Sequence, residues 1–152
     1  MNISVKLIAG LACLSLALHS CDKESLQINK VEDFNKEFGL KLNELASIKD
    51  STSHILVQVK NISDLRCKNH LTCADPGSAT VRLWVSNDKN SNAETMLYLD
   101  NLPRHSGSAD SVTLHMDNQN YTFRLHQVNP HPVNTNLETQ TVKLSVLPKR
   151  IN

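Results

Sequence analysis

Hydrophobic and polar residues alternate with a period of two along most of the chain after residue 38. The regular segments are "HILVQVK" (54–60), "ATVRLWVS" (79–86), "SVTLHM" (111–116), "NYTFRLHQV" (120–128) and "QTVKLSVL" (140–147). This period is typical of β-strands that have one buried and one solvated face. Two less regular strands are predicted at "FGLKLNEL" (38–45) and "ETMLYLDN" (94–101).

The alternation also divides the side chains of each strand between the core and the solvent. The polar side chains of the regular segments, together with Trp84, are predicted to point outward. The apolar side chains predicted to point inward are Ile55, Val57, Val59, Val81, Leu83, Val85, Val112, Leu114, Met116, Tyr121, Phe123, Leu125, Val142, Leu144 and Val146.

Turn-forming residues separate these seven strands, as in "NDKNSN" (87–92), "RHSGSAD" (104–110) and "MDNQN" (116–120). No segment of helical period and useful length lies between the strands, which excludes a parallel βαβ architecture. The sequence therefore predicts an all-β fold, namely an antiparallel β-sandwich of immunoglobulin-like topology. A small β-barrel is the alternative.

The first twenty residues follow a different pattern. Lys6 precedes an apolar run of twelve residues, Leu7–Leu18. As a helix this run would be about 18 Å long, which is too short to span the hydrocarbon core of a bilayer, about 30 Å thick. A charged start, a short apolar segment and a small residue before the break indicate a secretory signal peptide. It ends in "LHSC" (18–21), which resembles the lipobox of bacterial lipoproteins, although His19 is larger and more polar than the usual residue.

The lipobox resemblance implies that Cys21 is acylated and becomes the first residue of the mature protein. The expected organisation is a signal peptide (1–20), a polar tether (21–35) and a β-sandwich domain (36–150). The apolar residues of "SLQINKVEDFNKEFGL" (25–40) have a weak helical spacing that allows a short helix. The mature protein would be held by lipid in the bacterial cell envelope, outside the cytoplasm, on either the inner or the outer membrane.

The formal net charge of the chain limits which kinds of partner are expected. The sequence has 16 Lys and Arg residues against 15 Asp and Glu residues. Removal of Lys6 with the signal peptide leaves the mature chain neutral by formal count. A neutral chain has no basic field that attracts nucleic acid, so no nucleic-acid partner is expected.

Two cysteines, Cys67 and Cys73, flank His70 in "DLRCKNHLTCADPG" (64–77). Such residues can bind a metal, carry out redox chemistry or form a disulfide. Structural zinc sites need four ligands in close pairs, and thioredoxin-like sites use Cys-x-x-Cys beside a βαβ unit. Neither pattern is present. Because an envelope compartment favours disulfides, we expect a Cys67–Cys73 disulfide, which contributes about 2 kcal/mol by chain-entropy reasoning.

Three histidines, His54, His115 and His126, fall on the outward faces of their strands. If the strands brought them together they could bind a metal, so a metal-binding envelope protein is the alternative function. The sequence contains neither Gly-x-Ser-x-Gly nor His-Glu-x-x-His, and it has no glycine-rich phosphate loop. Neither an enzymatic activity nor a cofactor is therefore expected.

Trp84 is the single tryptophan and is predicted to point outward beside Arg82. An exposed aromatic side chain next to an arginine is typical of binding hot spots. Large aromatic side chains are, however, usually mostly buried, which favours a cover over Trp84 from a loop or from the tether.

The segment "NISDLRCKNHLTCADPGSATVRLWV" (61–85) and the later "VNPHP" (128–132) resemble a group of small, uncharacterised bacterial lipoproteins. That group carries Asp-Ser-Arg-Cys-Pro, a second cysteine after five residues, and Trp-Ala-Gly-x-Ala before a strand. Here Leu65 and Lys68 replace the serine and the proline, and "CADPGSA" lacks the tryptophan. The resemblance covers roughly residues 53–147.

This resemblance implies an all-β secreted domain with a Cys67–Cys73 disulfide and no particular activity. In such a domain Asp64 and Arg66 are expected to orient the stapled loop, through an ion pair or through hydrogen bonds to its backbone. Together with His70 and Trp84, they are the candidate binding residues.

The sequence as a whole predicts a lipid-anchored binding module of the cell envelope. Its expected partners are the membrane, through the anchor, and another envelope protein, a glycan or a host molecule. The expected contact surfaces are the Cys67–Cys73 loop and the connection "NPHPVNTN" (129–136).

Overall fold

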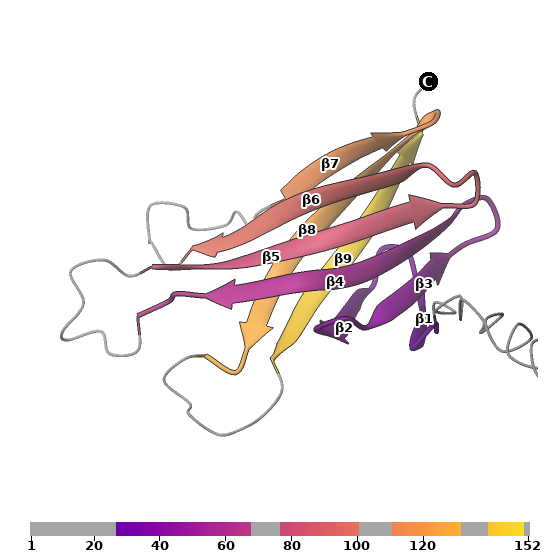
Figure 1. Ribbon diagram of the computed structural model, residues 1–152. Coiled ribbons are helices and arrows are strands. Elements are labelled where there is room, and N and C mark those ends of the chain that lie inside the picture. Colours follow the sequence, from indigo (N-terminus) through magenta and orange to yellow (C-terminus); the bar gives the residue numbers. More distant parts are fainter. Residues whose placement is uncertain (1–26, 68–76, 101–110, 132–139, 151–152) are drawn as a thin grey trace, which may run out of the picture.

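The computed structural model describes residues 27–67, 77–100, 111–131 and 140–150, and these residues form nine β-strands (Figure 1). The strands are β1 (Lys30–Asp33), β2 (Glu37–Lys41), β3 (Leu45–Lys49), β4 (His54–Asp64), β5 (Ser78–Asn87), β6 (Asn92–Asp100), β7 (Ser111–Met116), β8 (Gln119–Asn129) and β9 (Thr141–Arg150). Within these ranges there is no helix, and hence none of the length and hydropathy that a membrane span requires.

The strands form two sheets packed face to face, and Figure 1 shows β4, β5 and β6 in front of β8 and β9. Sheet A has the order β1-β3-β4-β5-β6, and sheet B has the order β2-β9-β8-β7. The predicted β-sandwich is therefore confirmed, and the two sheets do not close into a barrel. Four consecutive strands, β3 to β6, lie side by side in one sheet, whereas an immunoglobulin domain distributes its consecutive strands between two sheets.

The core between the sheets includes every side chain that the alternation assigns to it. All fifteen predicted inward residues contribute, although Val112 and Leu114 are only partly buried where β7 forms an edge of sheet B. Phe34 adds to them from the β1–β2 turn and stacks on Tyr121, with ring centroids 6.0 Å apart. Because the apolar face of each sheet covers the other, the period of two in the sequence becomes one continuous core.

The segment predicted as one strand at 38–45 is two strands in different sheets. β2 pairs with β9 in sheet B, and β3 pairs with β4 in sheet A. Between them Asn43 has a φ of 63°, a left-handed conformation that asparagine tolerates better than most residues. This turn transfers the chain from one sheet to the other and leaves Leu42 exposed.

Strand β1 lies inside the segment that was expected to be a tether. It runs parallel to β3, with Lys30 opposite Ala46. The amide of Asn29 donates to the carbonyl of Leu45 at 2.9 Å, and the side chain of Asn29 accepts from the amide of Leu45 at 2.9 Å. Residues 27–35 are extended or in a turn, so the weak helical spacing at 25–40 was misleading for this part.

Two β-bulges reverse the alternation near one end of the sandwich. The pairing of β4 with β5 shifts between Val59 and Asn61, and the pairing of β8 with β9 shifts between Leu125 and Gln127. A bulge inserts one residue and turns the following side chains to the opposite face. Asp64 consequently lies opposite Ala79 on the inner face of sheet A, and Val128 is buried.

Candidate functional site

Asp64 and Arg66 form a buried ion pair at the end of β4. Arg66 Nε donates to Asp64 Oδ1 at 2.8 Å, and Arg66 Nη2 donates to Asp64 Oδ2 at 2.5 Å. The backbone amide of Arg66 also donates to Asp64 Oδ1, at 3.2 Å. Arg66 Nη2 reaches across the sandwich to the carbonyl of Val128 at 2.7 Å. The guanidinium thus ties the end of β4 in sheet A to β8 in sheet B.

The burial of this pair leaves little of either side chain accessible for direct contact with a partner. The side chains of Arg66 and Asp64 are only 5% and 3% exposed. Their contacts agree with the other expectation, that they orient the loop that begins at Cys67. Cys67 is buried and disulfide-bonded. Cys21, His70 and Cys73 lie outside the described residues.

The three histidines of the metal hypothesis have separate partners. His54 contacts Ser47 and Asp88, His115 Nδ1 lies 3.0 Å from Asn120 Oδ1, and His126 Nε2 lies 2.8 Å from Ser145 Oγ. Sheet A holds His54, whereas sheet B holds the other two. Among the described residues no group of three or more His, Cys, Asp or Glu side chains is arranged to bind a metal. The structure does not bring the predicted ligands together.

A serine, a histidine and an aspartate form a hydrogen-bonded chain that sequence reasoning did not find. His54 Nε2 lies 2.9 Å from Ser47 Oγ, and His54 Nδ1 contacts Asp88 Oδ1. The connectivity matches that of a catalytic triad, but Ser47 is 5% exposed and lies in the middle of β3 between two paired strands. A nucleophilic serine must be open to substrate and to oxyanion donors. We infer that this chain fixes the β5–β6 turn against β3 and β4.

A small cavity of about 200 Å³ lies beside this chain, where the β3–β4, β5–β6 and β7–β8 turns meet. The hydroxyl of Tyr121 in this cavity donates to Gln119 Oε1 at 3.1 Å, and Ser53 Oγ donates to the same oxygen at 2.9 Å. Burial raises the pKa of the Tyr121 hydroxyl, a hydrogen bond with Ser53 opposes this rise, and nearby aspartates add to it. The lining of the cavity is mostly polar, and its hydrogen bonds connect the turns.

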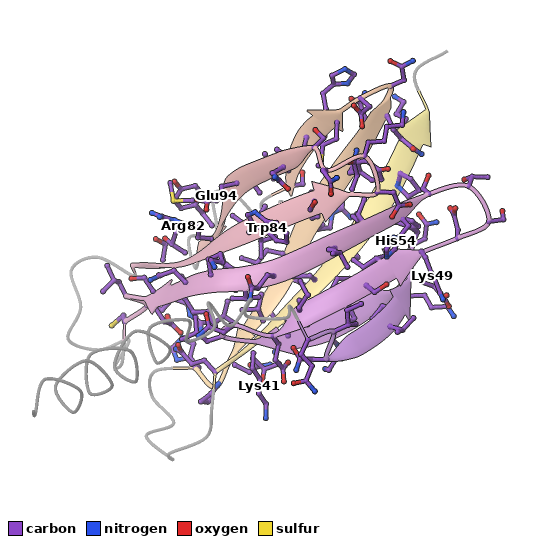
Figure 2. All side chains as sticks on the ribbon, turned by 45° about the vertical axis from the view of Figure 1, so that its right-hand side comes forward. Lys41, Lys49, His54, Arg82, Trp84 and Glu94 are labelled. Carbon is purple, nitrogen blue, oxygen red and sulfur yellow. The ribbon has the colours of Figure 1, made fainter. Side chains whose placement is uncertain are left out.

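The outer face of sheet A carries a different group of side chains, centred on Trp84. We call this surface the Trp84 face; its residues come from β4, β5 and β6. Figure 2 shows Arg82, Trp84 and Glu94 close together on the same side of the sheet, with His54 farther along it. The Trp84 face consists of Gln58, Lys60, Arg82, Trp84, Glu94, Met96 and Tyr98.

The register of the strands explains why these residues meet. Trp84 lies between Gln58 on β4 and Glu94 on β6, and Arg82 lies opposite Met96. Directly opposed residues on neighbouring strands have Cβ atoms about 5 Å apart, so the side chains form one contiguous surface. Two shallow hollows mark it, one beside Trp84 and one beside Arg82, and Glu94 lines both of them.

The Trp84 face combines exposed apolar side chains with charges that have no partner among the described residues. Met96 is 45% exposed and Tyr98 is 44% exposed. Trp84 has intermediate exposure, so part of its side chain is accessible on this face. Neither Arg82 nor Glu94 forms a salt bridge or a side-chain hydrogen bond within the described part of the chain. Arg82 and Glu94 can therefore pair with charged groups of a ligand without first breaking contacts to the described residues.

The outer face of sheet B provides a comparison within the same molecule. Its side chains are mostly polar, and Leu147, 40% exposed, is the large exposed apolar residue on it. Arg124 is exposed at a mid-strand position there, opposite Ser145. The two outer faces thus differ: among the described residues, the face of sheet A carries the exposed Tyr98 and the partly exposed Trp84.

Sequence reasoning identified Trp84 and Arg82 on this face but missed Met96 and Tyr98. The signal was present, because residues 96–99 are Met, Leu, Tyr and Leu, so this strand is apolar on both faces. With Leu97 buried, its neighbours Met96 and Tyr98 must point outward.

Comparison of the chain with protein-family models, with curated protein sequences and with solved structures finds no match.

Proposed function

We propose that this protein is a lipid-anchored binding module of the bacterial cell envelope, which contacts another envelope protein through the Trp84 face. The observation that supports this most directly is the clustering of Trp84, Arg82, Met96 and Tyr98 on one outer face. Tryptophan, tyrosine, methionine and arginine are the residues enriched at the centres of protein interfaces. Lys60 and Glu94 supply the charged rim that such interfaces have.

The rigidity of the strands supports the same function. Trp84 and Arg82 lie on β5, a ten-residue strand paired on both sides, by β4 and by β6. Side chains on a paired central strand lose little backbone freedom when a partner binds, which lowers the entropic cost of association. A surface formed by three adjacent strands therefore suits recognition without a large conformational change.

The first twenty-one residues support the envelope location. The short apolar run, the "LHSC" sequence and the switch to charged residues after Cys21 are the features of a lipoprotein signal. Acylation at Cys21 would place the domain outside the cytoplasm, where the Cys67 disulfide is chemically stable.

Acylation is tested by the intact mass of the protein extracted from membranes. We expect cleavage before Cys21 and a mass increase equal to the attached acyl chains, because the Cys21 thiolate is the acceptor. Cys21→Ser should lose this mass and leave the membrane fraction, whereas Cys13→Ser should behave as wild type, since position 13 lies in the signal peptide. An unmodified thiol at Cys21 of the wild type would contradict the proposed anchor.

Binding is tested by cross-linking and affinity capture of the full chain from its native envelope. We expect one envelope protein to be enriched with the wild type, and Trp84→Ala or Arg82→Ala to weaken its binding by roughly thirtyfold, which corresponds to about 2 kcal/mol for a hot-spot residue.

The matched control is Arg124→Ala, which removes the same exposed side chain from the opposite sheet. It should leave capture unchanged. Equal capture by all variants, or equal loss in all of them, would refute the Trp84 face as the binding surface. Thermal unfolding of each variant verifies that the domain is intact.

A further inference from the structure

The positive and negative charges of the Trp84 face are not balanced. Lys60 and Arg82 are its cations and Glu94 is its anion, and all three side chains are exposed. Within the described part of the chain none of them forms a salt bridge. Lys60 Nζ donates to the neutral amide oxygen Gln58 Oε1 at 3.3 Å, which leaves its charge uncompensated. The face therefore carries a net positive charge, although the chain as a whole is nearly neutral.

The strand register places the two cations side by side. Lys60 is the extra residue at the bulge of β4, and its neighbour Asn61 pairs with Arg82 on β5. Lys60 therefore stands beside Arg82. Like charges on neighbouring strands repel each other and destabilise the sheet, so the packing of the domain gives no reason for this pair. A carboxylate from a partner would relieve the repulsion, and bulges often reorient side chains in this way at functional sites.

Each cation lines a shallow hollow together with an apolar side chain. Lys60 lines one hollow with Trp84, and Arg82 lines the other with Met96. A carboxylate on an aliphatic stem complements such a hollow, because its charge meets the cation and its carbon atoms meet the apolar side chain. Arginine also binds carboxylates through two parallel hydrogen bonds. Acidic side chains of a polypeptide have this combination of groups.

We propose that the Trp84 face binds an acidic segment of its protein partner, whose carboxylates contact Lys60 and Arg82. This inference rests on the proposed function and adds the sign of the partner's charge. Glu94, which lines both hollows, repels a polyanion with an unbroken row of charges. A polypeptide avoids this repulsion, because neutral residues can separate its acidic side chains. Complementary charges of this kind speed association and fix the register of the partner.

Charge variants of the full chain test the proposal by affinity capture from the native envelope. We expect Arg82→Gln to weaken binding of the captured protein by roughly tenfold, and Lys60→Gln by a smaller factor, since each removes an attraction. Glu94→Gln should strengthen binding by roughly twofold, because it removes a repulsion. Higher ionic strength should weaken binding by the wild type, and less so in Arg82→Gln. Arg124→Gln, at an exposed position on sheet B, is the matched control and should behave as wild type.

The outcomes separate this inference from the proposed function. Weaker capture by Trp84→Ala with no effect of the charge variants would overturn the acidic partner and leave the binding surface in place. Stronger binding by Arg82→Gln, or weaker binding by Glu94→Gln, would indicate a basic partner and also overturn the inference. Capture that survives digestion of the extract with protease would assign the acidic groups to a glycan or a lipid, with the same consequence. Unchanged capture by all of these variants would refute the surface and the inference together.

The purified full chain in detergent allows a direct measurement with defined probes. Trp84 is the single tryptophan of the chain, so tryptophan fluorescence reports on this face alone. We expect a saturable change with a synthetic peptide in which glutamate and alanine alternate, and a smaller change or none with its lysine counterpart. Arg82→Gln should shift the midpoint to a higher concentration of the glutamate peptide. An equal response to both peptides, a larger response to the lysine peptide, or no response to either would overturn the proposal.

Discussion

Replacement of Arg66 with alanine is expected to lower the free energy of unfolding by about 3–5 kcal/mol, the usual cost of removing one member of a buried ion pair. The variant leaves the carboxylate of Asp64, 3% exposed, without its partner inside the sandwich. It also removes the donor to the carbonyl of Val128. Urea unfolding measures the loss. Since most domains have only about 5–15 kcal/mol of stability, this is a large fraction of the total.

Two further variants test whether the loss of stability in Arg66→Ala comes from leaving a buried charge without its partner. Lys36→Ala breaks the exposed Lys36–Asp33 pair, whose side chains are 69% and 62% exposed, and should leave the urea midpoint nearly unchanged, because solvent screens exposed ion pairs. The double variant Asp64→Leu, Arg66→Met removes both charges and should recover a large part of the loss seen in Arg66→Ala. A cost for Arg66→Ala no greater than that for Lys36→Ala would contradict the buried pair.

Replacement of Gly77 with alanine is expected to destabilise the domain by about 3 kcal/mol or more. Gly77 has a φ of 63°, and a Cβ atom there would lie 2.0 Å from the carbonyl oxygen of Leu65. The obstacle is backbone, which cannot rotate away as a side chain could. The adjacent hydrogen bond from the amide of Leu65 to the carbonyl of Ser78, 3.0 Å long, fixes the two segments against each other.

Gly39→Ala is the matched control for this prediction. Gly39 lies in β2, its φ is outside the left-handed region, and its nearest contact would be the Cγ2 atom of Thr141 at 3.2 Å. A small adjustment of a side chain accommodates the methyl group there, so we expect a change of less than about 1 kcal/mol. Comparable urea midpoints for the two variants would show that the Leu65 backbone can move away from position 77.

The binding surface could be predicted only in part from the sequence. The alternation placed Trp84 and Arg82 on one outward face, because that inference needs only the direction of neighbouring side chains on one strand. Their neighbours Gln58 and Glu94 come from β4 and β6, and the pairing register brings them together. Asp64 and Arg66 were expected to orient the loop, but their burial was not foreseen.

The sequence contained a signal for that burial. Val59 and Ile62 are both directed to the core although they are three residues apart, and the same holds for Leu125 and Val128. A spacing of three between inward residues breaks the period of two and indicates a bulge. Such a break looks like an ordinary strand end when the neighbouring strand is unknown.

The all-β class, most strand positions and the division of side chains between core and solvent could be predicted from the sequence alone. These properties depend on the two-residue repeat of an extended chain, which is local. The tertiary structure adds which strands share a sheet, how the bulges turn Asp64 inward, and that β6 lies at one end of the strand order of sheet A. Strand pairing depends on contacts between residues far apart in the chain, and many pairings satisfy the same alternation.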